Sequence, residues 1–309
     1  MQRINSVTVY LGSSGLCRDI FKETARETGK LIGQSKRELV YGGMDAGLMG
    51  IVANYSLEYG AHVTGIIPKS LKDSERIHPK LDETILVPDL WERKYLMFQR
   101  AEAIIALPGG FGTIDEALEV LYWADLSLHT KPIIFVNTDG YWNDFLAYLK
   151  TLPDMKQNYC LVANTVEDIF HKLEAWPKPS LLVKKEVSYP HFENEILAQE
   201  NENLIIETAD VKNSYLLATA LGLKQLGKHD RPMGLLNDKG QFNSLLKWID
   251  TAQKEHFITP KCTKLFSVAN TIDDLENMLA SQDETNIDLH SEKWGPSVTP
   301  THIEIVEKD

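Results

Sequence analysis

A glycine-rich segment at residues 108–116, Pro-Gly-Gly-Phe-Gly-Thr-Ile-Asp-Glu, combines residue types that can bind a phosphate and act on the group carrying it. It follows an apolar run, Ala103 to Leu107, typical of a buried strand, and precedes an amphipathic run, Ile114 to Leu126, typical of a helix. Backbone N–H groups of a glycine turn can approach an anion, and the helix dipole favours negative charge there. The segment therefore predicts a phosphate cradle with the Glu116 carboxylate one helical turn inside it.

The end of this segment also has an ordinary explanation. Thr113 followed three residues later by Glu116 is typical of a capping box, in which each side chain bonds the backbone of the other. A capped helix does not need three glycines before it, so Gly109, Gly110 and Gly112 favour a functional site.

Two further segments could contribute to such a site. The run from Gly42 to Gly50 fits either a wall of the site or a tight turn with close helix–strand packing. Arg93 could bind a phosphate or carboxylate through its forked guanidinium, or could lie on a solvated helix face with Met97 in the core. Sequence spacing alone leaves these alternatives open. The histidines and cysteines have no metal-ligand spacing, so we expect no metal site.

Alternating strand-like and helix-like runs would position these residues, up to about residue 178. Strand-like runs lie at 7–11, 38–41, 62–67, 85–87, 103–107, 132–136 and 160–162. Helix-like runs lie near 19–34, 47–59, 89–101, 114–127, 141–150 and 165–175. The alternation predicts an α/β fold with a Rossmann-like, doubly wound parallel sheet, whose ligands bind beyond the carboxyl ends of the strands. Glycine clusters follow three of these strands, at residues 12–15, 42–43 and 109–110.

The chain repeats part of itself beyond two prolines at residues 177 and 179. Residues 102–150 align without a gap with residues 202–250, and ten of these 49 positions are identical. After a six-residue insertion, the sequence Val-Ala-Asn-Thr at 162–165 reappears at 268–271.

The second copy lacks the chemistry of the first. Opposite the glycine-rich segment it carries residues 208–216, which contain no glycine and place Leu216 opposite Glu116. We therefore predict a catalytic domain at 1–178. At 179–309 we predict a degenerate half-copy, with 102–173 repeated as 202–279, followed by a polar tail.

Composition restricts the class of protein. The 309 residues are 43% hydrophobic and 25% charged, typical of a soluble globular protein. The net charge of −12 disfavours a nucleic-acid partner, and no apolar stretch approaches the roughly 18 residues of a membrane span. Three widely spaced cysteines and the lack of a signal-peptide pattern favour a cytoplasmic location.

Taken together, the motifs resemble those of the LOG (LONELY GUY) family of nucleoside 5′-monophosphate phosphoribohydrolases, many of which are labelled "possible lysine decarboxylase". The resemblance covers residues 7 to about 175. It rests on Gly-Ser-Ser at 12–14, Tyr-Gly-Gly at 41–43, Gly-Leu-Met-Gly at 47–50, Glu-Arg-Lys at 92–94 and the segment 108–116. Met44 stands where the family commonly has a third glycine.

The resemblance implies an enzyme that hydrolyses the N-glycosidic bond of a nucleotide to free base and ribose 5-phosphate, with no cofactor. By position, Arg93 and Glu116 match the catalytic pair. Cleavage builds positive charge on the sugar, which a carboxylate can stabilise. The positions matching substrate and phosphate contacts are Ser14, Gly43, Lys94, Met97, Gly109, Gly110, Gly112 and Thr113.

Three functions are open at this point. The first is a phosphoribohydrolase acting on AMP-like or cytokinin-type nucleotides, and the second is a non-catalytic nucleotide-binding or sensor protein of the same fold. Retention of both Arg93 and Glu116 favours the enzyme. The third, decarboxylation of an amino acid, normally needs pyridoxal phosphate on a lysine, and no lysine lies in or beside the glycine-rich segment. The resemblance also predicts a homodimer, or a pseudo-dimeric monomer in which the half-copy replaces a partner's helices.

Overall fold

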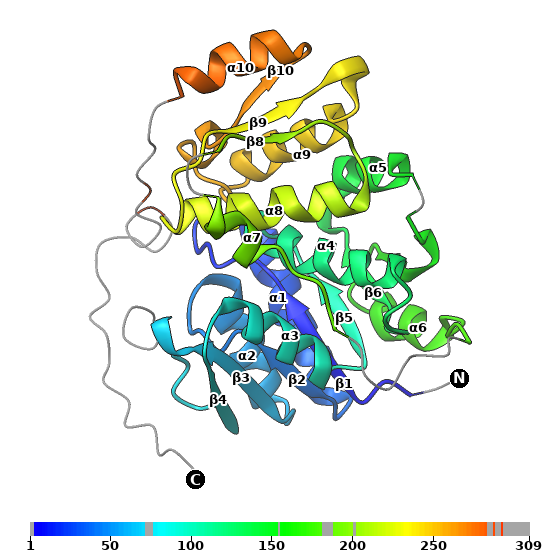
Figure 1. Ribbon diagram of the computed structural model, residues 1–309. Coiled ribbons are helices and arrows are strands. Elements are labelled where there is room, and N and C mark those ends of the chain that lie inside the picture. The colour runs from blue at the N-terminus through cyan, green and yellow to red at the C-terminus, as the bar shows by residue number, and fades with distance from the viewer. Residues whose placement is uncertain are drawn as a thin grey trace.

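A seven-stranded parallel sheet with flanking helices forms the first part of the chain (Figure 1). The computed structural model describes residues 3–71, 77–153, 155–180, 188–199, 202–282, 287 and 292. The strands are β1 (Ser6–Tyr10), β2 (Glu38–Tyr41), β3 (Val63–Pro68), β4 (Glu83–Val87), β5 (Ala103–Ala106), β6 (Ile133–Val136) and β7 (Cys160–Ala163). The helices are α1 (Asp19–Gln34), α2 (Gly47–Glu58), α3 (Leu90–Arg100), α4 (Phe111–Asp125), α5 (Asn143–Thr151) and α6 (Asp168–Ala175).

The predicted α/β fold is confirmed, and each expected strand is present within about two residues. Strands β5 and β6 read as continuous apolar runs because helices cover both faces of a parallel sheet. Two helices begin three residues from the predicted position: α6 begins at Asp168 instead of residue 165, and α4 begins at Phe111 instead of Ile114. The last glycine of the turn therefore belongs to the first helical turn, which brings the N-terminus of α4 up to the end of β5.

The order of strands fixes where a ligand can bind. It is β4-β3-β2-β1-β5-β6-β7, so the connections reverse direction between β1 and β5. Loops on the two sides of such a switch point diverge and leave a crevice beyond the carboxyl ends of the strands. All three glycine clusters lie at this edge, after β1, β2 and β5.

A second, three-stranded parallel sheet, in the order β10-β9-β8, belongs to the C-terminal part of the chain. Its elements are α7 (Glu193–Ala198), β8 (Leu204–Ile206), α8 (Val211–Gln225), β9 (Met233–Leu236), α9 (Asn243–Lys254), β10 (Ser267–Ala269) and α10 (Ile272–Ala280). In the sequence, the strands of the first sheet precede residue 178 and those of the second sheet follow it. A domain boundary at that residue stays a prediction.

The internal repeat is also a repeat of local geometry. After β6, the Asn137 side chain accepts from the backbone N–H of Trp142 at 2.8 Å, and after β9 Asn237 accepts from Phe242 at the same distance. In each copy a histidine ring contacts a helix carbonyl at 2.9 Å, His129 in the first. Asp139 and Lys239 have positive φ angles of 50° and 55°. The 100-residue offset therefore describes equivalent positions in space.

The two copies pack against each other through equivalent helices, α4 against α8 and α5 against α9 (Figure 1). The contacts occur in pairs related by the 100-residue offset. Trp142 stacks on Trp248 with ring centroids 5.8 Å apart, and Tyr148 lies 6.2 Å from Phe242. Reciprocal pairs of this kind are the signature of approximate two-fold symmetry.

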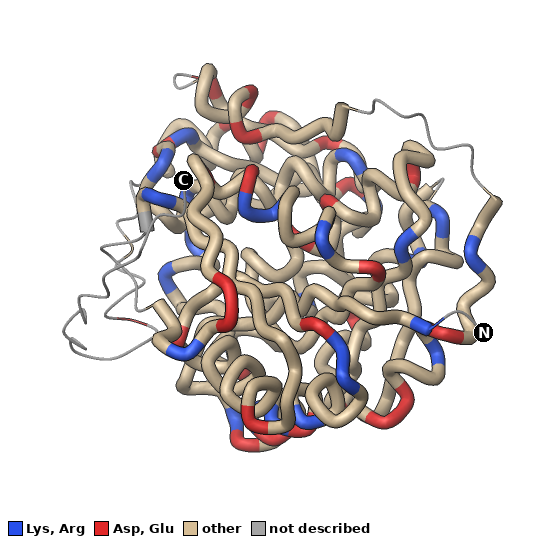
Figure 2. The backbone as a smooth tube through the Cα atoms, turned by 90° about the horizontal axis from the view of Figure 1, so that it is seen from below, with Lys and Arg blue, Asp and Glu red and all other residues tan. Residues whose placement is uncertain are grey.

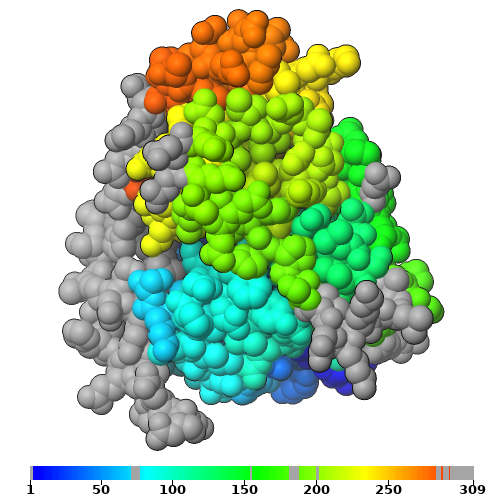
Figure 3. Space-filling model, viewed as in Figure 1, coloured from blue at the N-terminus to red at the C-terminus, as the bar shows by residue number. Residues whose placement is uncertain are grey.

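Both copies contribute residues to the surface of the protein (Figure 3). In Figure 3 the yellow-green atoms of α7 and α8 lie directly on the atoms of the N-terminal part of the chain. In the view of Figure 2, basic and acidic residues are interspersed around the chain. No helix within the described ranges is long and apolar enough to cross a membrane.

Candidate functional site

Three glycine loops converge beyond the carboxyl ends of β1, β2 and β5. The Gly12 N–H donates to the Pro108 carbonyl at 3.1 Å, which joins the first loop to the third. A Cβ added to Gly109 would lie 2.7 Å from the nitrogen of Gly12, and one added to Gly47 would collide with the Ser13 carbonyl. These glycines are therefore required by the close approach of one backbone to another.

The N-terminus of α4 is free of side-chain caps. Its N-cap residue is Gly110, and Thr113 lies two residues inside the helix, so the capping-box alternative is wrong. The first N–H groups of a helix have no intrahelical partner, which makes this terminus a suitable anion site. A Cβ added to Gly112 would meet nothing within 4 Å. The open space beside Gly112 is where a ligand could approach the helix.

Arg93 reaches this edge of the sheet from α3. Its guanidinium lies against Gly42, where any Cβ would collide with Nη2. Its Nε is buried and has no hydrogen-bond partner among the described residues. Burying a donor without an acceptor is costly, so an acceptor on a ligand could satisfy this donor.

Glu116 lies on the first turns of α4, close enough to Arg93 for their charges to interact. Burial raises the pKa of Glu116 to about 7, and the positive charge of Arg93 opposes that rise. The residue is only partly exposed. No direct ion pair joins these two described side chains, so both retain capacity for a ligand. A carboxyl with a pKa near neutrality can exist in either protonation state at the working pH, as acid–base chemistry requires.

Lys94 lies elsewhere than the family resemblance implied. Its ammonium is buried between α3 and α4, 2.9 Å from Asp115 and 3.4 Å from Glu119, and 3.6 Å from Glu193 of α7. Burial alone would lower its pKa, but the carboxylates outweigh that effect and raise the pKa well above its ordinary value. The geometry therefore favours an ion-pairing role for Lys94 over the expected phosphate contact.

The buried ion-pair cluster also joins the two copies. Thr219 of α8 donates to Asp115 at 2.6 Å, and Tyr215 of α8 donates to Glu119. The pairs 115–219 and 119–215 are reciprocal under the 100-residue offset. Because Lys94 and Asp115 are the immediate neighbours of Arg93 and Glu116, the cluster fixes α3 and α4 relative to each other.

The other predicted contacts fall into two groups. Gly43 has a φ of +77°, which favours glycine, and Ser14 is buried with its hydroxyl accepting from the Leu16 N–H at 3.2 Å. Thr113 is also buried beside Gly109. Met97, by contrast, is 1% exposed and belongs to the hydrophobic core. The structure therefore favours the core alternative for Met97 over the predicted pocket lining.

Sequence reasoning missed two aromatic residues that hold the glycine turn. Tyr141, after β6, donates its hydroxyl to the Gly109 carbonyl at 2.5 Å. The ring of Phe257, in the C-terminal copy, lies 2.5 Å from the position of a Cβ on Gly12. The only sequence signal for Phe257 is that it falls in the connection of the second copy that contains the six-residue insertion.

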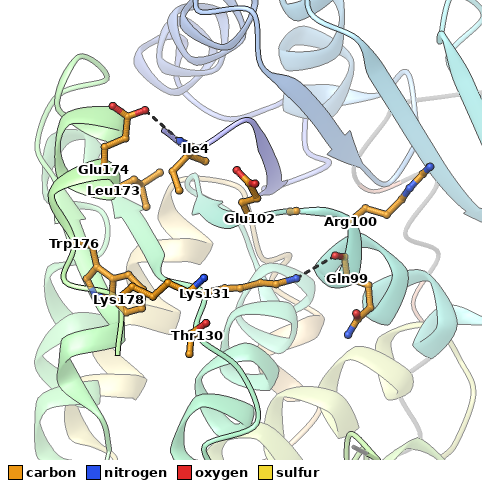
Figure 4. A pocket seen from close by; sticks show the side chains of 11 residues that line it. Ile4, Gln99, Arg100, Glu102, Thr130, Lys131, Leu173, Glu174, Trp176 and Lys178 are labelled. Atoms are coloured by element: carbon orange, nitrogen blue, oxygen red, sulfur yellow. Dashed lines mark hydrogen bonds between the residues drawn. The ribbon is translucent and has the colours of Figure 1, made fainter. Parts of the chain in front are cut away.

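A separate cavity lies at the opposite edge of the sheet, near the amino ends of β1, β5 and β6 (Figure 4). Its volume is about 250 Å³. Lys131 points across it, but this ammonium already donates to the carbonyls of Phe98 and Gln99 at the end of α3. The cavity contains neither Arg93 nor Glu116 and is not the predicted site.

The described residues contain no group of three or more His, Cys, Asp and Glu side chains arranged to hold a metal ion. The arrangement at the switch point can instead bind an anion at α4 and place a carboxyl and a guanidinium beside the group attached to it. An open doubly wound sheet with a glycine-lined anion site at its switch point is typical of nucleotide-binding α/β proteins.

Comparison with known proteins identifies the family. A family model described as "Possible lysine decarboxylase" matches residues 49–173 and 217–279, the second stretch lying in the half-copy. Cytokinin riboside 5′-monophosphate phosphoribohydrolase LOG5 of Arabidopsis thaliana is 34% identical over 221 residues, covering 67% of this chain and 97% of that protein. The probable enzyme LOG4 of Oryza sativa subsp. japonica is 42% identical over 144 residues, 47% of this chain and 63% of its own. The chain belongs to the LOG family.

Solved structures are also similar. The molybdenum cofactor binding protein of Rippkaea orientalis has a TM-score of 0.45 and 20% identity, covering 57% of this chain and 98% of its own. The Moco carrier protein of Chlamydomonas reinhardtii has the same TM-score and identity, with coverages of 56% and 96%.

Proposed function

We propose that this chain is a nucleoside 5′-monophosphate phosphoribohydrolase acting on AMP-like or cytokinin-type nucleotides. One observation carries the proposal: Glu116 and Arg93 lie within reach of the uncapped N-terminus of α4, where a 5′-phosphate would bind. The chain aligns with 97% of the length of the Arabidopsis thaliana relative, which is named as an enzyme of this activity. The non-catalytic alternative has no comparable support.

The proposed reaction uses water to break the bond between C1′ and the base nitrogen. The base leaves with the bonding electron pair and gains a proton, while water adds to C1′ and loses one. The transition state carries positive charge on the sugar, which ionised Glu116 would stabilise while it orients the attacking water. Arg93 would position the nucleotide, and the N–H groups at Gly110 to Gly112 would hold its phosphate.

The geometry gives less support to the decarboxylase activity in the family description. A lysine that forms a Schiff base must lose its proton, and enzymes lower its pKa for that purpose. The carboxylates around Lys94 raise its pKa instead. Lys94 therefore has the properties of a structural cation.

The proposal is tested by incubating the protein with a panel of nucleoside 5′-monophosphates and separating free base and ribose 5-phosphate by chromatography. We expect base release by the wild type and a loss of about 10³-fold in kcat for Glu116→Gln, the range for removing a general acid–base group. The matched control is Leu216→Gln, the equivalent position on α8, which should retain full activity.

Two results would contradict the proposal. Full turnover by Glu116→Gln would remove Glu116 from the mechanism. Tight nucleotide binding without base release from any candidate would restore the sensor alternative.

We also propose that the chain is a pseudo-dimeric monomer. The reciprocal pairs between α4 and α8, and between α5 and α9, cover the face that a second copy would need for equivalent packing. Sedimentation should give the mass of one chain, 35.0 kDa. A tight homodimer formed through α4 and α5 would overturn this proposal.

A further inference from the structure

The C-terminal copy contributes one segment directly to the glycine loops. Helix α9 is 12 residues long, whereas its counterpart α5 has nine, and the connection to the next strand contains the six-residue insertion. Residues 255–258, the inserted segment, follow α9 directly in this connection. Its second residue, His256, has a positive φ of 60°, and the segment is held to α9 by the N–H groups of Phe257 and Ile258, which both donate to the carbonyl of Ala252.

This segment packs against two of the three glycine loops, those after β1 and β5. The Phe257 ring lies where a side chain on Gly12 would be, 2.5 Å from that Cβ position. The Phe257 carbonyl lies 2.6 Å from the Cβ position of Gly110, the N-cap of α4. Phe257 is 1% exposed. One buried residue of the second copy therefore touches both backbones that would surround a phosphate.

An aromatic cluster connects Phe257 to the glycine turn at residues 109–112. The Phe257 ring packs edge-on against Phe21 at 5.3 Å and against Tyr141 at 5.1 Å between centroids. Tyr141 in turn donates its hydroxyl to the Gly109 carbonyl. The turn is thus fixed from behind by side chains from α1, from the segment after β6 and from the insertion.

An ion-pair bridge at the surface holds the same segment. Arg18, at the start of α1, contacts Glu255 at 2.6 Å and Asp139 at 2.7 Å. It joins the loop after β1, the turn after β6 and the inserted segment.

We infer that the inserted segment, residues 255–258, is a positioning element for the phosphate turn of the first copy. The half-copy has no catalytic pair of its own, yet the site depends on it through Phe257. This inference rests on the proposed function for its kinetic consequence, because a misplacement of the phosphate by about 1 Å can cost roughly 100-fold in rate. Its binding consequence is independent of turnover.

The experiment compares Phe257→Leu and Phe257→Ala with Phe242→Leu in the full chain. Phe242 is a fully buried phenylalanine of the same copy that packs on Tyr148, away from the glycine turn. Calorimetry measures the Kd of ribose 5-phosphate and of ribose, and melting curves measure stability. We expect Phe257→Leu to weaken ribose 5-phosphate binding about tenfold, with a larger loss for Phe257→Ala, and no change for ribose. Phe242→Leu should lower the melting temperature comparably and leave ribose 5-phosphate binding within about twofold.

A variant at the surface tests the same inference without removing a side chain from the core. Glu255→Gln removes a bridge whose carboxylate contacts a half-exposed arginine, so it should fold normally and weaken ribose 5-phosphate binding several-fold. Unchanged ribose 5-phosphate binding in folded Phe257→Leu and Glu255→Gln would overturn the inference. Equal weakening in Phe242→Leu would also overturn it, because a general loss of stability would then explain the effect.

The two proposals fail in different ways. Ribose 5-phosphate has no scissile bond to a base, so its binding is measurable whether or not the wild type releases base. Binding without base release contradicts the proposed function alone. No binding of ribose 5-phosphate by the wild type contradicts both.

Discussion

The N-termini of α4 and α8 occupy equivalent positions in the two copies, but only one of them is available to a ligand. The N-cap of α4 is Gly110, which has no side chain, whereas the N-cap of α8 is Asp210, whose carboxylate accepts from the Asn213 N–H at 2.7 Å. In the second copy the protein's own carboxylate fills the place that a phosphate would take in the first.

The side chains that bond the turns before α4 and α8 also differ in which backbone groups they satisfy. Tyr141 donates to the carbonyl of Gly109 and leaves the neighbouring N–H groups open, whereas its counterpart Gln241 accepts from the N–H of Ala209 at 2.8 Å. The same backbone becomes either a binding site or a self-satisfied structural turn, according to whether side chains satisfy its donors. The second copy thereby gains local stability and loses the capacity to bind an anion.

The largest expected effect concerns the buried ion-pair cluster that joins the copies. Lys94→Met leaves the carboxylate of Asp115 without its cation, and an uncompensated buried charge costs about 3–5 kcal/mol. Chemical denaturation should show this loss of unfolding free energy at neutral pH. The control Lys22→Met, which breaks an exposed pair with Asp19, should cost less than about 1 kcal/mol. Equal costs would mean that the cluster does not hold α3 and α4 together.

A pair of glycine variants separates the active loops from the second copy. Gly42→Ala places a methyl group against the Arg93 guanidinium, and displacing that side chain should lower kcat/KM about 100-fold. Gly222→Ala, in the interior of α8 with open space around it, should leave kcat/KM unchanged and stabilise the fold by roughly 0.5–1 kcal/mol. Wild-type kinetics in Gly42→Ala would show that Arg93 does not act from its position on that glycine.

The pH profile tests the protonation state of Glu116. Burial raises its pKa to about 7, and the proposed mechanism needs the ionised form. Accordingly kcat/KM should rise about tenfold per pH unit below pH 7 and level off above it. A profile that falls above pH 7 would instead assign Glu116 as the general acid.

Stability should change with pH in the opposite direction. Burial raises the pKa of Glu116 to about 7 and of Glu119 to about 8, above the ordinary value of 4.5. The folded state therefore binds more protons than the unfolded state, and its stability falls as pH rises from about 4.5 to about 8. Denaturation of Glu119→Gln across this range should show a shallower dependence.

The smallest expected effect is at the self-capped helix. Asp210→Ala removes the cap of α8 and should lower the unfolding free energy by about 1 kcal/mol, with no change in kcat/KM. A large loss of activity would show that the N-terminus of α8 communicates with the site.

Several features of the fold follow from local sequence and could be predicted. Buried parallel strands such as β5 and β6 are apolar throughout, and glycine clusters mark the turns after strands, so the alternation of elements was recognisable. The offset of 100 residues predicted the equivalence of α4 with α8. The glycine-rich segment and Glu116 were found because their spacing is short enough to lie on one turn and one helix.

Other features were beyond local reasoning because they depend on contacts between distant segments. Helix α4 begins at Phe111 without a side-chain cap, at a point where Gly109 and Gly110 lie against the distant residues Gly12 and Phe257. Lys94 and Met97 lie on faces of α3 that periodicity cannot assign to core, ion pair or site. Phe257 is 145 residues beyond Gly112 in the sequence.

The sequence by itself therefore determined the order of elements, the repeat and the chemical groups available for a phosphate site, because these depend on patterns within a few turns of chain. The tertiary structure alone decided which groups meet. The strand order brings Gly12, Gly42 and Gly109 to one edge, and the packing of α4 on α8 places the inserted segment behind them. Burial among those contacts, which no local pattern encodes, raises the pKa of Glu116 towards neutrality.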